Sequence, residues 1–499
     1  MKKGLMCGLF ILLILATMSV SSAATVYNVT SQTELMSAIW EAAGDDIIIE
    51  IKNDLIMSHV YLPINFSAGN ITVNGNGYNI TGRNMSSAMF WINGAAVEFN
   101  DMNITNSTAN MANSKHVIEV YNGSAVIESC VFENNLIQSA VWADGRYGPV
   151  DVKINNTSFI KHGYNLVLAT NGSVVEVKNS YVCGEGYGVM YVFSIQRGSD
   201  VLIENVTIID TIVSQSYMMV YDSTFNITGL TIENADFFRM VPGLIWIRNS
   251  TGIIQNSYFG NNSFFACETD SDAVVGNIAA IYDSDVKIIQ NTVFNSTSNN
   301  SGQSTVYSGN GNVTFAFNTM YPRLYDEAPI NGNLLVYDSD AYEMYFGTNV
   351  PAMNGGYAKT IKLDISGQNQ AIEQVTLEEY AIIMGSSSGS DLDATGSKRL
   401  RGDKIDLGAV ESFYKRSVID TIIDTITGDS SEDDDDNKMN SSGGVPTRPS
   451  LLMFIFGSDS IFEGMSNLLY YILNNYVEWD QPGISAFHQS IIDVLGLEP

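Results

Sequence analysis

Few residues in this sequence combine the types and spacing that catalysis needs. The four histidines stand far apart, at His59, His116, His162 and His488, and none lies between two glycines. His162, in Lys161-His162-Gly163, comes nearest to that setting, but we interpret it as a loop residue. Acid–base cleavage of a polysaccharide needs carboxylates or histidines gathered at one place. No such cluster is recognisable, and we assign no catalytic residue.

Two acidic turns are the candidates for a cation site. Asp283 and Asp285 lie in one Tyr-Asp-Ser-Asp turn, and Asp338 and Asp340 lie in another. A calcium site takes about six to eight oxygen ligands, whereas each turn offers two carboxylates. Aspartate is also common in turns because its side chain bonds nearby backbone. We therefore assign no metal ligand, and no cofactor either, because the sequence has no Cys/His metal spacing, P-loop or dinucleotide fingerprint.

Two further features invite a functional reading. Arg401-Gly402-Asp403 matches an adhesion tripeptide of some animal proteins, but it lies inside a longer closing motif that gives it another role. Cys7 lies in an N-terminal apolar run, which leaves Cys130, Cys183 and Cys267. An odd, sparse set of cysteines is no disulfide framework. We expect small buried hydrophobic side chains, with a single bridge left open.

The elements that must position any site are short repeated strands. Ile289–Phe294 reads Ile-Gln-Asn-Thr-Val-Phe, and related hexads start at Ile154, Ile203, Ile232 and Ile254, with weaker copies at Phe99, Ile127, Val177 and Ala316. The copies recur at roughly 25 residues, a period typical of solenoids. Each unit holds apolar, β-branched strands separated by Asn, Asp, Ser and Gly turns. The pattern predicts a parallel β-helix, because propellers have longer units and helical repeats have another periodicity.

An asparagine recurs at the third hexad position. It is found at residues 156, 179, 205, 234, 256, 291 and 318. Such a residue could point inward at a corner and bond the backbone of neighbouring coils. It could equally point outward, favoured only by the turn conformation. Both interpretations remain open from the sequence.

The chain divides into four predicted parts. Residues 1–24 form a signal peptide, with a basic start, an apolar core and a small-residue cleavage site. Residues 25–413 form the β-helix. Residues 414–449 form an acidic flexible linker. Residues 450–499 form a two-helix module, which is small enough that we expect it to dock on a partner. No apolar run in the mature chain is long enough to predict a transmembrane helix.

Within the β-helix part, we expect a helix to cover the first coil. Ser31-Gln-Thr-Glu34 is a capping box, and the helix runs to about Ala43 with Leu35, Ile39 and Trp40 on one face. The first strand is Ile47–Ile51. The stack continues to about Tyr321 and adds one coil over residues 334–345. Residues 360–383 then form a mixed closing segment.

The composition limits the function classes. The net charge of −30 argues against nucleic-acid binding, which needs a basic face. The signal peptide predicts a secreted or cell-surface protein. Glycosylation sequons are dense, although Asn-, Ser- and Thr-rich turns also produce them by chance. Examples are Asn28, Asn70, Asn103, Asn122, Asn171, Asn205, Asn226, Asn249 and Asn312.

A family resemblance also indicates an exported protein. The start, from Val26 to Ile51 and then Ile71–Gly77, resembles the opening of right-handed parallel β-helix proteins of the pectin-lyase-like superfamily. The ending, from Asp393 to Glu411, resembles the closing signature of secreted bacterial and archaeal β-helix surface proteins. The whole is similar to adhesin-like proteins of methanogenic archaea. The resemblance implies attachment or envelope structure, and it transfers no catalytic residue because the enzyme motifs do not match.

Three functions follow as hypotheses. The first is a non-enzymatic, adhesin-like protein that binds carbohydrate or another cell-surface component. The second is a polysaccharide lyase or glycoside hydrolase on the same fold, which would need carboxylates grouped from adjacent coils. The third is a structural envelope protein that assembles through residues 450–499.

Overall fold

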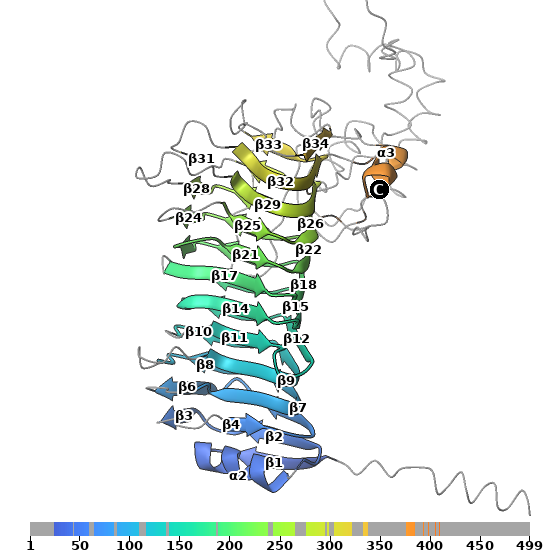
Figure 1. Ribbon diagram of the computed structural model, residues 1–499. Coiled ribbons are helices and arrows are strands. Elements are labelled where there is room, and N and C mark those ends of the chain that lie inside the picture. The colour runs from blue at the N-terminus through green and yellow to red at the C-terminus, as the bar shows by residue number, and fades with distance from the viewer. Residues whose placement is uncertain are drawn as a thin grey trace, which may run out of the picture. The chain divides into compact units, whose positions relative to one another are not determined.

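The computed structural model describes one parallel β-helix (Figure 1). It describes residues 24–337, except 43, 59–63, 84–86, 109–115, 136–138, 186–187, 238–242, 265–275, 295–296, 299–303 and 322–332, together with residues 376–384, 393, 398, 405 and 409. All of them lie in one compact unit, Met1–Thr421. The predicted signal peptide, linker and two-helix module lie outside the described residues.

Three parallel ladders of strands build the helix, and we name them A, B and C in their order along each coil. Ladder A contains β4 (Ile64–Phe66), β7 (Phe90–Asn100), β9 (His116–Glu128), β11 (Ser139–Asp144), β14 (Tyr164–Thr170), β17 (Gly188–Gln196), β21 (Met218–Tyr221), β25 (Ile245–Arg248), β29 (Gly276–Ile289) and β32 (Ser304–Ala316). The long strands β7, β9, β29 and β32 continue into ladder B. A short branch beside ladder A contains β20 (Ile212–Val213), β24 (Asp236–Phe237), β28 (Ser263–Phe264) and β31 (Thr297–Ser298).

Ladders B and C complete each coil. Ladder B adds β1 (Thr25–Val29), β2 (Ile47–Ile51), β5 (Asn70–Asn74), β12 (Val150–Asn155), β15 (Val174–Lys178), β18 (Asp200–Glu204), β22 (Thr224–Thr228), β26 (Thr251–Gln255) and β34 (Asn333–Tyr337). Ladder C is an 11-stranded sheet among the described residues. It contains β3 (Leu55–Ser58), β6 (Asn79–Arg83), β8 (Asn103–Thr105), β10 (Val131–Glu133), β13 (Ser158–Ile160), β16 (Tyr181–Cys183), β19 (Thr207–Ile209), β23 (Thr231–Glu233), β27 (Tyr258–Gly260), β30 (Thr292–Phe294) and β33 (Thr319–Tyr321).

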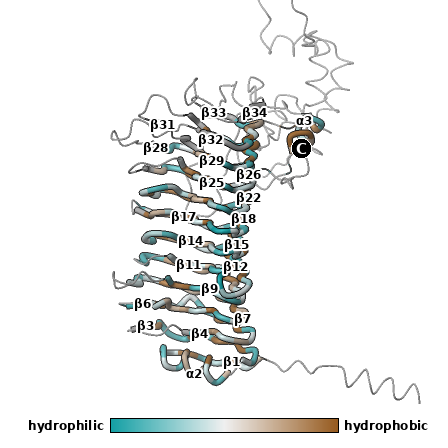
Figure 2. Tube along the Cα trace, viewed as in Figure 1, coloured by the Kyte–Doolittle hydropathy of each residue, from teal (hydrophilic) through white to brown (hydrophobic). Residues whose placement is uncertain are grey.

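Alternate residues of every strand point into the interior, and equivalent residues stack from coil to coil. Hydrophobic and hydrophilic positions alternate along the coils accordingly (Figure 2). In ladder B the register places one buried column at Ile49, Val73, Phe99, Ile127, Ile154, Val177, Ile203, Ile227, Ile254, Ile288 and Phe315. The parallel β-helix predicted from the hexads is therefore confirmed.

Three of the predicted hexads are out of this register. Ile232 lies in β23 of ladder C, and the ladder B residue of that coil is Ile227. Ile289 pairs with Gln255, and Ala316 pairs with Ile289, which places both one position after the buried column. They are apolar because another segment covers that outer face. The sequence alone cannot tell an inward apolar residue from an outward one that a later segment covers.

The covering segment is α3 (Leu377–Met384), which is mostly apolar (Figure 2). Gln255 Nε2 donates to the Tyr380 hydroxyl at 2.7 Å, and Lys287 Nζ donates to the Met384 carbonyl at 2.6 Å. The ring centroids of Phe317 and Tyr380 lie 6.3 Å apart. The described part of the predicted closing segment, from residue 376 onward, thus packs on the outer face of ladder B.

The N-terminal end is capped as predicted, with two corrections. Helix α2 (Gln32–Ala42) buries Leu35, Ala38 and Ala42, whereas Trp40 is 86% exposed and does not belong to the buried face. The first strand is β1, which pairs in parallel with β2. The amide of Glu34 donates to Ser31 Oγ at 3.3 Å, while the Glu34 carboxylate accepts from the Thr30 amide at 2.7 Å. The capping box therefore holds, with Thr30 as its second partner.

Left-handed residues turn the chain at each corner. Asn156, Asn179, Asn205 and Asn256 have φ between 48° and 54° at the corner from ladder B to ladder C, and Asn234 has φ 53° at the next corner. Asn tolerates this conformation better than most residues. The side chains of Asn179 and Asn205 are exposed and bond outward to the preceding coil. The outward interpretation of the repeated asparagine is correct at these two positions.

Asn291 and Asn318 instead follow the left-handed corner residues Gln290 and Phe317. They point inward, so the inward interpretation of the repeated asparagine is correct at these positions. Asn291 Oδ1 accepts from the Ser257 amide at 2.8 Å, and Asn318 Oδ1 accepts from the Asn291 amide at 2.8 Å. Both asparagines are buried, and their Nδ2 atoms donate to carbonyls of an earlier coil. Serines repeat the same device between ladders A and B, where the Ser223 and Ser250 amides each donate to a serine hydroxyl one coil further on.

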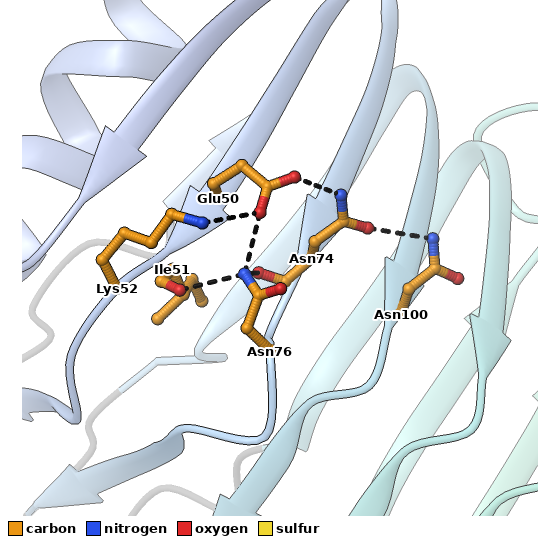
Figure 3. A network of polar contacts seen from close by, with 6 residues as sticks. All are labelled: Glu50, Ile51, Lys52, Asn74, Asn76 and Asn100. Carbon is orange, nitrogen blue, oxygen red and sulfur yellow. Dashed lines mark hydrogen bonds and ion pairs between the residues drawn. The ribbon is translucent and has the colours of Figure 1, made fainter.

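A polar network holds the outer face of the first coils together (Figure 3). The Glu50 carboxylate accepts from Asn76 Nδ2 at 2.9 Å, from Asn74 Nδ2 at 2.7 Å and from Lys52 Nζ at 3.1 Å. Asn100 Nδ2 extends the row by donating to Asn74 Oδ1 at 3.3 Å. These donors, Asn76 first, lower the pKa of Glu50 to about 2.

The substitution Glu50→Gln is expected to cost about 1 kcal/mol at neutral pH, since the group is partly exposed and solvent screens its charge. The folded-state pKa lies below the unfolded one, so this stabilisation is present above about pH 4.5 and disappears toward about pH 2. Urea unfolding of both proteins at neutral and acid pH checks this. A difference that persists unchanged below pH 2 would show that the charge is not the cause.

Candidate functional site

Those candidate residues from the sequence that the structure describes do not come together. His162 is buried in the turn after β13, and neither ring nitrogen has a hydrogen-bond partner among the described residues. Burial lowers the pKa of this imidazole to about 3. His162 does lie in a loop, as predicted, but it points into the corner and does not reach solvent. It is a buried structural residue, and its imidazole is uncharged at neutral pH.

The described aspartates and cysteines among the candidates also have structural roles. Asp283 is an exposed corner residue with φ 52°, and Asp285 accepts from Asn312 Nδ2 at 2.8 Å, which fits the turn interpretation. Cys130 and Cys183 are free and buried, as predicted, and burial raises the pKa of Cys130 to about 12. The part of the chain that the structure describes holds no group of three metal-ligating side chains. His59, His488, Cys267, Asp338, Asp340 and the Arg401–Asp403 tripeptide lie outside it.

The best candidate site is an aromatic patch on the outer face of ladder A, formed by Trp91, Tyr121, Trp142 and Tyr147. Ring centroids are 5.8 Å apart between Trp91 and Tyr121, and 5.4 Å apart between Tyr121 and Trp142, both edge to face. Tyr147 follows at 5.7 Å from Tyr121 and is 69% exposed. Strands β7, β9 and β11 are neighbours in the ladder, so the patch spans three consecutive coils (Figure 1).

Charged and polar groups border this patch. Glu119, which pairs with Trp91 on one side and Trp142 on the other, hydrogen-bonds to the Tyr121 hydroxyl. Burial and then the Glu119 charge raise the pKa of Tyr121 well above its usual range. Tyr121 therefore stays a neutral phenol, suited to binding and not to proton abstraction.

The second carboxylate near the patch, that of Asp144, already bonds to other groups of the protein. Asp144 is buried, and its Oδ2 lies 3.3 Å from Arg146 Nη2. Asp144 Oδ1 accepts from Asn171 Nδ2 and from the Arg146 amide. The Arg146 guanidinium lies 5.8 Å from the Tyr147 ring centroid. The Trp91 indole N–H is buried and has no hydrogen-bond partner among the described residues, so Trp91 offers a ligand its ring and not its N–H.

An open groove of about 590 Å³ adjoins the patch along the chain. Gly94 and Gly123 line it, three residues after Trp91 and two after Tyr121. Both have left-handed φ, 113° and 120°, and a Cβ on Gly123 would collide with the Ala95 carbonyl. The groove floor is thus kept free of side chains by the turn geometry. Asn70 and Asp151 supply polar atoms at its edge.

The aromatic patch was missed from the sequence, although a signal was present. Trp91, Tyr121 and Trp142 each precede a turn glycine by two or three residues, in three successive units. An aromatic residue repeated at the outward position of adjacent coils has no core to fill. Finding it required the strand register, which decides which residues face outward.

Comparisons with known proteins concern the fold. No protein-family model matches the sequence, and no curated protein matches it. Among solved structures, an alginate lyase from Paenibacillus sp. str. FPU-7 matches at 13% identity over 64% of this chain and 100% of that chain, with a TM-score of 0.32. The pectate lyase Pel9A matches at 12% over 78% and 97%, with a TM-score of 0.34. The periplasmic alginate epimerase AlgG matches at 9% over 63% and 84%, with a TM-score of 0.26. At these identities and TM-scores, no residue role is transferred from these proteins to this chain.

Within the described residues, neither helix is long and apolar enough to cross a bilayer.

Proposed function

We propose that this protein is an exported, adhesin-like β-helix protein that binds carbohydrate through the aromatic patch without cleaving it. The observation that supports the proposal is the row of half-exposed aromatic rings on three adjacent coils. A sugar ring has apolar C–H faces that pack on aromatic rings, and hydroxyl groups that bond to carboxylates and to N–H donors. The patch offers both kinds of contact, through Trp91, Trp142 and Glu119.

The location at the cell surface belongs to the same proposal. It rests on the signal-peptide pattern of residues 1–24 and on the resemblance of the start and ending to exported β-helix proteins. A protein exposed outside the cell meets glycans of its own envelope and of other cells. The net charge of −30 keeps such a protein soluble.

The substitution Trp142→Ala is expected to weaken glycan binding about tenfold or more, or about 1.4 kcal/mol, because buried aromatic anchors dominate recognition surfaces. A glycan array on the chain from residue 25, followed by calorimetry on the hits, measures this. Trp40→Ala is the matched control, since Trp40 is an exposed tryptophan on α2 outside the patch. Equal binding by both variants would remove the aromatic patch as the site.

Polysaccharide cleavage is the second candidate, because Glu119 and Asp144 flank Tyr121 from adjacent coils. Two carboxylates at one place are what glycosidic cleavage needs. Here each carboxylate already accepts protein hydrogen bonds, which favours the binding function. Release of reducing sugar or unsaturated product from the array hits separates the two. Product that disappears with Glu119→Gln would establish the enzyme and overturn the non-enzymatic proposal.

A further inference from the structure

A second group of large side chains lies further along the same outer face of ladder A. We call Tyr221, Trp246 and Arg248 the distal patch. The Arg248 guanidinium lies 5.8 Å from the Tyr221 ring centroid, a cation–π contact. Tyr221 is 38% exposed and Trp246 is half-buried. The strand register pairs Tyr221 with Arg248, and Met219 with Trp246, across β21 and β25.

The distal patch is in line with the aromatic patch. The register runs from Trp142 to Leu168, from Leu168 to Ser194, from Ser194 to Met219 and from Met219 to Trp246. Trp142 and Trp246 therefore occupy the same outward column, four strand steps apart. Adjacent strands are about 4.8 Å apart, so the two tryptophans are separated by about 19 Å along the stacking axis. The intervening strands β14, β17 and β21 lie directly between them (Figure 1).

Between the patches, the described positions of two outward strand columns carry no ionised side chain. One outward column supplies Leu168, Ser194 and Met219, and the next supplies Thr170 and Gln196. At the aromatic patch, the cation Arg146 is already paired with Asp144. Two exposed cations border this stretch: Arg197 follows Gln196 in the turn, and Arg248 comes after Tyr221 at the far end of the second column. A polyuronate would bring one negative charge for every sugar, next to Glu119 in the aromatic patch and against an overall protein charge of −30. The face therefore suits an uncharged chain.

We propose that the distal patch is a second binding subsite, and that the ligand is an uncharged linear glycan lying along the stacking axis across both patches. This inference rests on the proposed carbohydrate binding. Linking two weak contacts in one ligand makes the second contact intramolecular, so affinity should rise with chain length until both patches are reached. A short oligosaccharide can occupy only one patch.

The test compares two-residue and six-residue oligomers of glucan, mannan, xylan, galacturonate and alginate, by calorimetry on the full chain. At least one neutral hexamer is expected to bind about tenfold or more tighter than its dimer, with little dependence on salt. Trp246→Ala should remove this length advantage, because only the aromatic patch then remains to bind the hexamer. Tyr221→Ser is the milder second variant, and the circular dichroism spectrum and melting temperature confirm that each variant folds.

The outcomes separate the two proposals. Neutral-glycan binding that is lost in Trp142→Ala but has no length advantage, or keeps it in both distal variants, would overturn the distal subsite alone. Tighter binding of galacturonate or alginate, weakened by salt, would overturn the uncharged ligand. No binding of any oligomer would count against the proposed function itself. Trp40→Ala again serves as the control and should bind like the wild type.

Discussion

Acidification is expected to destabilise the wild-type protein progressively below about pH 6.5, and the substitution His162→Asn is expected to remove most of that loss. The neutral imidazole of His162 is fully buried with neither nitrogen paired among the described residues. Charging it inside the β-helix would cost far more than charging it in the unfolded chain, because no counter-charge or acceptor among the described residues compensates for the lost hydration.

The direction in which stability changes with pH follows from the folded and unfolded pKa values of His162. The pKa of His162 is about 3 when folded and 6.5 in its ordinary state. Above about pH 6.5 both states are neutral and His162 contributes nothing to the pH dependence. Between those values only the unfolded chain takes up the proton, so stability falls by about 1.4 kcal/mol for each pH unit. Below about pH 3 the loss levels off, because the folded protein is protonated as well.

The variant is designed from the equivalent corner positions. Asn135 and Asn262 occupy the places of His162 in two other coils, as the strand register shows. Each accepts a backbone amide through Oδ1 and donates to a carbonyl through Nδ2. The side-chain amide that His162→Asn introduces should do the same with the Asn135 amide and the Phe132 carbonyl. The variant is therefore expected to be at least as stable as the wild type at neutral pH.

Denaturant unfolding of the two proteins from about pH 7 to about pH 3 measures the effect as a difference. Other acid-sensitive groups, including Glu50, titrate in both proteins and cancel in that comparison. The stability difference should reach about 3 kcal/mol near pH 4.5, where about two pH units separate the condition from the ordinary pKa. Parallel stability curves over this range would mean that His162 is hydrated or paired in solution.

The fold was predictable because a β-helix repeats its chemistry. Strand, turn and inward column recur in every unit, so Ile154 and Ile203 carry the same information, and so do their turns. The wrong predictions concerned the strand register, which decides whether a residue points into the core or outward. Ile289 looked like a core residue because α3 covers it, and that contact joins residues more than ninety positions apart, as the bond from Lys287 to Met384 shows. No local pattern reports a contact of that range.

The candidate site was harder to predict than the fold for a related reason. Trp91, Tyr121 and Trp142 become a patch only when three coils stack, and each is unremarkable within its own strand. A search for catalytic residue types passes over aromatic rings. The sequence could therefore exclude several chemistries, yet it could not locate the surface that the structure offers to a ligand.

The repeated asparagine shows most clearly that the sequence could not predict which side chains point inward. A substitution at one inward asparagine is the second prediction with a large expected effect. Asn291→Ala is expected to cost about 2–5 kcal/mol, because it leaves the Ser257 amide and the Ile254 carbonyl buried without their partners. It also removes one of the two donors to Asn318 Oδ1, since Asn291 Nδ2 is lost and the Asn291 backbone amide remains. Asn179 was indistinguishable from Asn291 in the hexad, but its side chain is exposed and bonds to the side chains of Asn155 and Asn205 on the outer face.

The matched variant at the outward position is Asn179→Gly, which keeps a residue suited to φ 48° and removes only exposed hydrogen bonds. Its cost should stay below about 1 kcal/mol, because water replaces the lost partners. Urea unfolding of both variants decides whether inward and outward asparagines play different roles. Comparable losses would mean that the turn conformation, and not the buried ladder, is what the repeated asparagine provides. A large loss confined to Asn291→Ala would identify the corner ladder as a main source of stability between coils.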